Sequence, residues 1–364
     1  MDSFAFIIHP ISPKRDVSRK FPFLGRVLNE KQINFFSTFF PPVYISEIEG
    51  IRSEATGKTI KGWFIACPLT PARMLELPEK WVYRKIIQTG RMAEKLGAQI
   101  LGLGAFTSVI GDAGATIANA LDIPVTTGDS YTVSIALQAV KDAAQEMNIP
   151  LENATAAVVG ANGAIGQVCA EMLAESVQEL ILIGRRPDAL DALKGRLQTA
   201  FPGCRIRTST EMNDIRHAQL ILTVTSAIDQ IIHPEHLQPG SVICDVARPR
   251  DVSTRVAEAR DDVLVIDGGM VDIPGPVDFH FDFGFPPKKA YACMAETIAL
   301  TLDGRFEDYT IGKQIRPQQV VEITKIADKH GLRLSGFRSF EKPVSEAQIA
   351  HVRARATSTR QAKR

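Results

Sequence analysis

From residue 151 onward, short β-branched apolar segments alternate with polar segments of helix length. This alternation restricts the fold more than any other feature of the chain. The apolar segments cover residues 156–159, 180–183, 220–224, 242–245 and 263–266. Continuous apolar strands at this spacing are typical of a parallel sheet that is covered by helices on both faces. The second half of the chain is therefore predicted to be an α/β domain built on a parallel sheet.

The remaining segments suggest one domain before this sheet and helices after it. Strand patterns cover residues 4–8, 43–49 and 59–66, and helical patterns cover 81–96, 131–147, 290–302 and 317–330. Residues 351–364 hold five basic residues and no acidic ones, which predicts a frayed tail. We predict an N-terminal α/β substrate domain over residues 1–130 and a nucleotide-binding domain with its linking helix over 131–290. A C-terminal helical segment with a basic tail is predicted over 291–364.

Composition excludes several classes of protein. The 364 residues include 42 Lys+Arg and 41 Asp+Glu, and this balance argues against a dedicated nucleic-acid binder. No run of about 18 apolar residues predicts a membrane-spanning helix. Residues 1–10 lack the basic start of a signal peptide. Five scattered cysteines without a CxxC pair indicate a reducing compartment, and we expect a cytoplasmic protein without a metal site.

A glycine-rich loop follows the apolar strand 156–159 and precedes a helix. Its sequence, Gly-Ala-Asn-Gly-Ala-Ile-Gly over residues 160–166, spaces three glycines as GxxGxxG. Glycine lets the backbone approach a pyrophosphate, and the helix N-terminus offers unpaired N–H groups to it. The alternative is a tight turn without a ligand. We predict a Rossmann-type domain whose dinucleotide is held by Gly160, Asn162, Gly163, Ala164, Ile165 and Gly166.

The end of the next strand indicates which dinucleotide binds. An NAD site usually has Asp or Glu there to bind the ribose hydroxyl, whereas this chain has Arg185 and Arg186. Because guanidinium groups bind phosphate with two hydrogen bonds, these residues favour the 2′-phosphate of NADPH. The alternative is that both arginines are solvated loop charges.

One cysteine lies where a thiol could become a nucleophile. Cys293 follows Pro286-Pro287 and falls near the start of a helix, one turn from Lys288 and Lys289. A helix N-terminus and nearby cations lower the pKa of a thiol, and a thiolate beside a nicotinamide can accept an acyl group from a thioester for reduction. The other cysteines are interpreted as buried or idle thiols.

The loop at residues 104–108, Gly-Ala-Phe-Thr-Ser, follows a strand pattern in the first half of the chain. Thr107 or Ser108 could donate a hydrogen bond to the thioester carbonyl as negative charge develops there. The same residue types also cap helices, and this alternative stays open.

Four segments resemble one enzyme family along nearly the whole chain. The chain is similar to the long-chain acyl-[acyl-carrier-protein] reductases of cyanobacteria, which make fatty aldehydes. The resemblance implies an acyl-enzyme on Cys293, NADPH on the glycine loop, and an acyl chain bound largely by the N-terminal half. Ala105 and Asp129 depart from the family pattern, which has Gly and Asn. The matching segments are Arg-Asp-Val-Ser-Arg at 15–19, Leu-Gly-Ala-Phe-Thr-Ser-Val-Ile at 103–110, Thr-Thr-Gly-Asp-Ser-Tyr-Thr at 126–132 and Ala-Cys-Met-Ala-Glu at 292–296.

Other functions and partners stay open. Quinate/shikimate-type and amino-acid dehydrogenases share this domain order, although the motif Asn-Val-Thr-x-Pro-x-Lys is absent from the first half of the chain. A non-enzymatic NADPH-binding sensor, with a structural Cys293, is a further alternative. For the reductase, the substrate is a long-chain fatty acyl thioester of acyl carrier protein or coenzyme A. A peripheral membrane contact and a downstream aldehyde-consuming enzyme are additional candidate partners.

Overall fold

The computed structural model describes residues 1–362 and divides the chain into two compact units. The first unit combines Met1–Tyr131 with Val271–Arg333, and the second combines Thr132–Met270 with the segment that starts at Leu334. The predicted third segment, 291–364, is therefore divided between the two units. The reason is that α12 (Ala292–Asp303) packs against strands of the first unit.

The first unit is built on a five-stranded sheet with the order β2-β3-β1-β4-β5. The pair β2–β3 is antiparallel and the other neighbouring strands are parallel. The loops that leave β1, β4 and β5 therefore meet at one edge of this sheet. The strands are β1 (Ser3–Ile8), β2 (Val43–Arg52), β3 (Thr59–Ala66), β4 (Leu101–Gly102) and β5 (Val125–Thr126).

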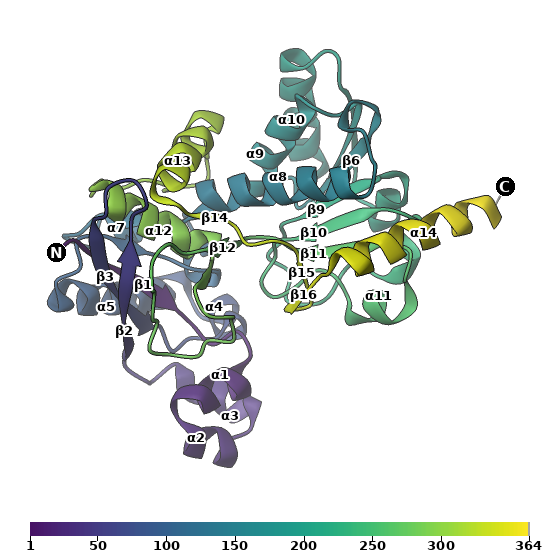
Figure 1. The fold of residues 1–364 in the computed structure, drawn as a ribbon. Helices are drawn as coiled ribbons and strands as arrows, with labels where there is room; N and C mark the ends of the chain where they lie inside the picture. The colour runs from purple at the N-terminus through teal and green to yellow at the C-terminus, as the bar shows by residue number, and fades with distance from the viewer. Residues whose placement is uncertain (363–364) are drawn as a thin grey trace. The chain divides into compact units, whose positions relative to one another are not determined.

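Helices cover both faces of this sheet, as Figure 1 shows. Ala5 and Ile7 of β1 belong to a core that includes Val82 and Ile86 of α5 (Glu79–Leu96). On the opposite face, a Cβ at Gly102 would lie 2.2 Å from the hydroxyl of Thr297, so glycine there lets α12 approach β4 closely. The smaller helices of the first unit are α1 (Pro13–Lys20), α2 (Pro22–Val27), α3 (Glu30–Ser37), α4 (Pro71–Glu76), α6 (Phe106–Val109), α7 (Ala115–Ala118) and α13 (Pro317–His330).

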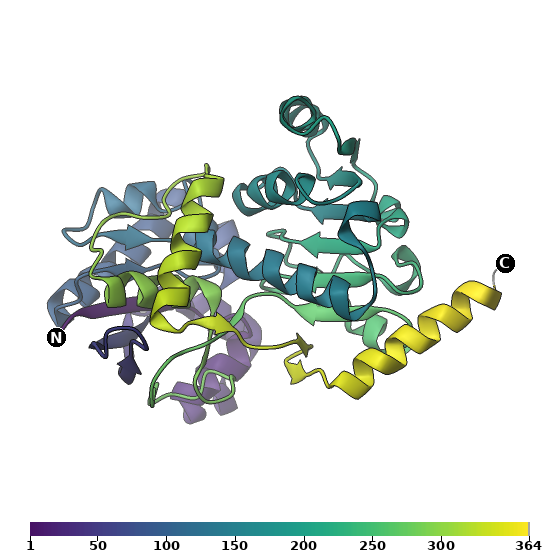
Figure 2. The same ribbon diagram turned by 45° about the horizontal axis from the view of Figure 1, so that its top comes forward.

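The second unit contains six parallel strands in the order β11-β10-β9-β6-β7-β8, which lie side by side in Figure 2. This is the strand order of a Rossmann fold, so the predicted α/β class and parallel sheet are confirmed. The edge strand β8 was not predicted, because its pattern is polar and half-exposed. The strands are β6 (Thr155–Val159), β7 (Glu179–Ile183), β8 (Arg205–Ser209), β9 (Leu220–Thr223), β10 (Val242–Asp245) and β11 (Leu264–Asp267).

The helices of the second unit include α8 (Asp129–Glu146), whose first residues belong to the first unit, and α9 (Ala164–Ala174) directly after the glycine loop. Strand residues on both faces of the sheet are buried, as the continuous apolar runs predicted. The remaining helices are α10 (Pro187–Ala200), α11 (Thr254–Ala259) and α14 (Glu346–Ala362).

The C-terminal segment corrects one prediction. Residues 346–362 form α14 rather than a frayed tail, while residues 363–364 lie outside the described part. Contacts with the rest of the second unit stabilise this helix. Arg355 pairs with Asp261 at 2.8 Å, and Arg360 donates hydrogen bonds to the carbonyl oxygen of Pro239.

Within residues 1–362, none of the helices has both the length and the apolar character needed to cross a bilayer.

Candidate active site

Cys293 is the second residue of α12 and lies beside the loop that follows β5. Gly128 in that loop has a φ of +77°, and a Cβ there would lie 2.3 Å from Cys293 Cα and 2.5 Å from its Cβ. Glycine is therefore required at position 128 both for its backbone conformation and for the close approach. The predicted location of Cys293 at a helix start is found in the structure.

The loop after β4 reaches the same sulfur. Ala105 has a φ of +47°, in the left-handed region that favours glycine. The backbone groups of Met294 and Ala105 lower the pKa of the Cys293 thiol. Two elements distant in sequence thus act on one sulfur.

Thr107 and Ser108 are buried within this loop, and both hydroxyls bind its backbone. The Thr107 hydroxyl donates to the Gly104 carbonyl at 2.8 Å and accepts from the Gly104 N–H at 3.0 Å. The Ser108 hydroxyl donates to the Ala105 carbonyl at 2.7 Å. These bonds run from within α6 back to the carbonyl groups three residues earlier, so they are not the N-cap bonds of the alternative interpretation, because the N-cap of α6 is Ala105 and has no side-chain cap bond. They hold the backbone at Gly104 and Ala105 in place.

His9, which the sequence analysis missed, also supports this loop. It follows β1 directly and is buried, and its Nε2 accepts a hydrogen bond from the Phe106 N–H at 3.1 Å. Burial lowers the pKa of His9 to about 4, so the ring stays neutral at neutral pH and keeps accepting this bond. A polar residue immediately after a buried strand was the signal that could have identified it.

The charged groups that act on Cys293 are acidic. The pKa of the Cys293 thiol is raised to about 12, first by burial and then by the charges of Asp129 and Glu296. The prediction that Lys288 and Lys289 activate the thiol is not supported, because Lys289 pairs with Asp272 at 2.6 Å. The effect of the Met294 backbone at the helix start is the part of the predicted activation that the structure retains.

Glu296 lies one turn after Cys293 and is completely buried. Its carboxylate accepts hydrogen bonds from the Thr126 hydroxyl, from the Thr310 hydroxyl at 2.8 Å and from the Tyr131 N–H at 2.8 Å. Residues three apart lie on the same face of a helix, so the spacing between Cys293 and Glu296 is the sequence signal that could have identified Glu296.

Asp129 opens α8 and is also buried, beside this pair. Burial and the charge of Glu296 raise the pKa of Asp129 from 3.8 to about 7. Asp129 can therefore gain or lose a proton near neutral pH, and its charge controls how easily Cys293 becomes a thiolate.

In the second unit, the glycine loop has the geometry of a phosphate cradle. Gly160 has a φ of +89°, and a Cβ at Gly166 would lie 2.2 Å from the Gly160 carbonyl oxygen. Gly163 is the N-cap of α9, so Ala164 and Ile165 form its first turn and their N–H groups are free of helical partners. Such a glycine-lined turn at a helix N-terminus fits the pyrophosphate of a dinucleotide.

The predicted phosphate-binding arginines lie at the end of β7, and both are exposed. The backbone N–H of Arg186 donates to the Asn162 side chain at 3.2 Å, and its guanidinium donates to the Asn162 carbonyl at 3.3 Å. Asn162 therefore connects the glycine loop to the end of β7, and its side-chain oxygen is used in this connection. Arg186 is thereby attached to the glycine loop, and Arg185 directly precedes it.

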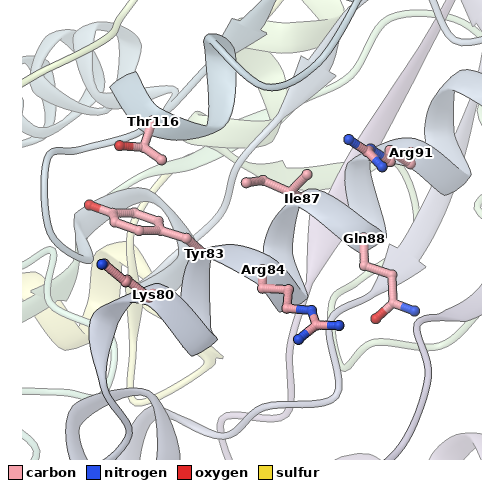
Figure 3. Close-up of a pocket in the computed structure, with 7 residues that line it drawn as sticks. All are labelled: Lys80, Tyr83, Arg84, Ile87, Gln88, Arg91 and Thr116. Carbon is pink, nitrogen blue, oxygen red and sulfur yellow. The ribbon is translucent and has the colours of Figure 1, made fainter.

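A separate groove runs along α5 in the first unit (Figure 3). Lys80, Arg84 and Arg91 are exposed along it and form no ion pair within the described residues. Figure 3 shows Tyr83 opposite Thr116. The Tyr83 hydroxyl oxygen also accepts a hydrogen bond from the Asp112 N–H at 2.9 Å. The segment that begins at Ala105 therefore leads from Cys293 to this groove.

Sequence comparisons relate the chain to dehydrogenases and to a reductase. The family model "Shikimate / quinate 5-dehydrogenase" matches residues 141–267, which excludes Cys293. The aminotransferase PigE of a Serratia strain is 30% identical over 305 residues, which is 83% of this chain and 35% of that protein. The long-chain acyl-[acyl-carrier-protein] reductase of Synechococcus elongatus is 28% identical over 334 residues, which is 88% of this chain and 94% of that protein.

Two solved structures that match over most of the chain have low TM-scores. L-tryptophan dehydrogenase from Nostoc punctiforme has a TM-score of 0.42 and 11% identity, covering 98% of this chain and 89% of that one. Quinate dehydrogenase from Corynebacterium glutamicum has a TM-score of 0.37 and 11% identity, covering 90% and 98%. These values are too low to indicate a substrate. The sequence matches, together with the Rossmann sheet, support an NAD(P)-dependent oxidoreductase.

Proposed function

We propose that the protein reduces a long-chain fatty acyl thioester to the fatty aldehyde with NADPH, through a covalent thioester on Cys293. The observation that carries this proposal is that Cys293, unlike the other four cysteines, is partly exposed, at the start of α12 where the loop at Gly128 packs directly against it. The similarity to the Synechococcus reductase, which spans nearly the full length of both proteins, supports it.

The residues of the first unit account for acyl transfer. Cys293 loses its proton, its sulfur attacks the thioester carbonyl carbon, and the donor's thiolate leaves and takes up a proton. The backbone groups of Met294 and Ala105 stabilise the negative sulfur before the attack. When the acyl group is later released as aldehyde, the same groups stabilise the sulfur as a thiolate.

The charge of Asp129 affects how easily Cys293 loses its proton in this step. Its negative charge opposes ionisation of Cys293, so the thiolate forms more easily when Asp129 is protonated. Because the pKa of Asp129 is about 7, both of its states are populated near neutral pH.

The cofactor is proposed to be NADPH, held by the glycine loop at residues 160–166 and by Arg185 and Arg186. When bound, NADPH supplies the hydride that reduces the acyl group. The chain's own contribution is to bind the pyrophosphate at the start of α9 and the 2′-phosphate with guanidinium groups.

The donor is proposed to be acyl carrier protein rather than coenzyme A. Carrier proteins are acidic, and the α5 groove presents Lys80, Arg84 and Arg91 without neutralising partners in the described residues. Opposite charges speed association and orient the partner. The groove is also connected to the loop of Ala105 through Asp112.

A dehydrogenase acting on a quinate- or shikimate-like acid is the alternative function. The observation in its favour is the family model that matches residues 141–267. Such an enzyme has no need of Cys293 as a nucleophile, so the first experiment below separates the two functions.

The first prediction concerns the acyl-enzyme. Mixed with a long-chain acyl thioester and no NADPH, the protein should gain the mass of one acyl group on the peptide that contains Cys293, and NADPH should then release aldehyde. Cys293→Ser should form no aldehyde, because an alkoxide is a much poorer leaving group than a thiolate. Cys204→Ser, which changes a buried thiol elsewhere, should retain the adduct. Aldehyde formation by the Cys293→Ser variant would overturn the mechanism.

The second prediction concerns Asp129 and pH. Its folded-state pKa lies above the ordinary value of 3.8, so the folded protein binds this proton more tightly than the unfolded chain does. Stability should therefore fall as the pH rises from about 4 to about 7, by at most ~4 kcal/mol from this group. Asp129→Asn should lose less stability than wild type between about pH 5 and about pH 8 in urea unfolding. The exposed-site control Asp122→Asn should follow wild type.

The same substitution should make Cys293 more acidic, because it removes a negative charge beside the thiol. The measurement is the rate of Cys293 alkylation by iodoacetamide as a function of pH. The midpoint should move to lower pH in Asp129→Asn. An unmoved midpoint would mean that Asp129 does not act on the sulfur.

The third prediction concerns cofactor preference. Arg185→Ala combined with Arg186→Ala should reduce the ratio of kcat/KM for NADPH over NADH about tenfold or more, since a lost charge-assisted contact costs roughly 1.5–3 kcal/mol. Lys194→Ala, a cation on α10, is the matched control and should leave the ratio unchanged. A ratio that does not respond to the double variant would exclude the arginines from the site.

The fourth prediction concerns the donor. Charge reversal by Lys80→Glu, Arg84→Glu and Arg91→Glu should raise KM for acyl carrier protein substrates about tenfold or more and leave activity with acyl-CoA unchanged. The control triple Lys31→Glu, Lys141→Glu and Lys325→Glu changes the net charge equally at other exposed sites. Equal losses with both donors would place the groove outside carrier recognition.

A further inference from the structure

Helices α1, α2 and α3, with the residues just after them, expose an unusual number of phenylalanines. Six of the chain's 18 phenylalanines lie between residues 21 and 40, and Val27 between them is 62% exposed. We call these seven side chains the aromatic surface. The exposed fractions are 42% for Phe21, 74% for Phe23, 56% for Phe35, 41% for Phe36, 70% for Phe39 and 42% for Phe40.

These three helices bury very little of themselves. No residue of α1 is buried, α2 buries only Gly25, and α3 buries only Ile33 and Ser37. Figure 1 shows them grouped at one end of the first unit. Apolar surface of this extent is uncommon on a protein without a partner, because exposing it to water is unfavourable. The aromatic surface therefore needs an explanation beyond the packing of the fold.

The helices are nevertheless well formed and anchored. Asn29 and Gln32 form a capping box at the start of α3. A Cβ at Gly25 would lie 1.8 Å from the hydroxyl of Ser18, so α2 crosses α1 closely at this glycine. The Lys20 ammonium donates to the Ile45 carbonyl at 2.7 Å, which attaches α1 to the sheet. The phenylalanines are therefore exposed on helices that are themselves fixed in the fold.

Positive charge surrounds the aromatic surface. Residues 13–40 contain six basic and two acidic side chains, a net charge of +4, whereas the whole chain has a net charge of +1. Lys14, Arg26 and Lys31 are exposed and form no ion pair within residues 1–362. The surface is therefore both apolar and cationic.

A surface that is both apolar and cationic fits some binding partners better than others. A second copy of the chain would bring its own net charge of +4 against this one, because a two-fold interface pairs a surface with itself. Protein interfaces are also depleted of lysine at their centre. In contrast, phenylalanines with surrounding Lys and Arg are the features by which short helices lie in the headgroup layer of an anionic bilayer.

We infer that the aromatic surface of α1–α3 binds the protein to the surface of an anionic lipid bilayer. The phenylalanines enter the headgroup and acyl boundary, while Lys14, Arg26 and Lys31 contact lipid phosphates. The inference rests on the exposure and charge of residues 13–40, so it does not depend on the proposed reductase activity.

Co-sedimentation of the full chain with vesicles tests this inference. Wild type should sediment with vesicles of phosphatidylglycerol and phosphatidylcholine, more weakly with phosphatidylcholine alone, and less as salt rises. Phe23→Ser with Phe39→Ser should weaken binding about tenfold or more, because two exposed rings no longer enter the lipid. Lys14→Glu, Arg26→Glu and Lys31→Glu should remove the preference for anionic vesicles.

The matched control is Ile228→Ser with Val321→Ser, which removes two exposed apolar side chains outside α1–α3 and should sediment like wild type. Circular dichroism should find all variants equally folded. Wild type remaining in the supernatant, or control variants losing binding equally, would overturn the inference. A lipid-free dimer in analytical ultracentrifugation that the Phe23→Ser, Phe39→Ser variant cannot form would also overturn it, because a second copy would then cover the surface.

Discussion

The buried carboxylate of Glu296 is the interaction on which the arrangement of the candidate site depends. Removing a carboxylate from water costs several kcal/mol unless hydrogen bonds replace the lost hydration. Glu296 obtains these bonds from Thr126 at the end of β5, from the Tyr131 N–H in the first turn of α8, and from Thr310 beyond α12. The same bonds bring Cys293 and Asp129 together, so the group that stabilises this contact also determines the electrostatics of the thiol.

The parts of this structure that could be predicted from sequence are those specified by neighbouring residues. The parallel strands, the glycine turn before α9 and the helix start at Cys293 all follow from patterns within a few residues. The bond between Tyr131 and Glu296 joins residues 165 positions apart, and the contact of His9 with Phe106 spans 97. Such contacts depend on how the strands are ordered in the sheet, which no local pattern specifies.

Charges were predicted least well, for the same reason. Lys289 is close to Cys293 in sequence, yet its ammonium pairs with Asp272, and the carboxyl group that acts most strongly on the thiol, that of Asp129, comes from another element, α8. The basic C-terminal segment was predicted to fray because it contains no acid of its own. In the structure, Asp261 and backbone carbonyls elsewhere in the second unit supply the partners that make α14 an ordered helix.

Ala105 links the loop geometry to the chemistry of the site. A residue with a side chain at positive φ costs on the order of 1–3 kcal/mol, so the surroundings must hold it there. The Ser108 hydroxyl donates a hydrogen bond to the Ala105 carbonyl, and the Thr107 hydroxyl bonds both the N–H and the carbonyl of Gly104. The neutral ring of His9 accepts a hydrogen bond from the N–H of the next residue, Phe106. The conformation that these residues impose is the one in which the Ala105 backbone acts on the Cys293 sulfur. Thr107 and Ser108 therefore stabilise the backbone conformation at Ala105, while their hydrogen bond to a thioester carbonyl stays a prediction.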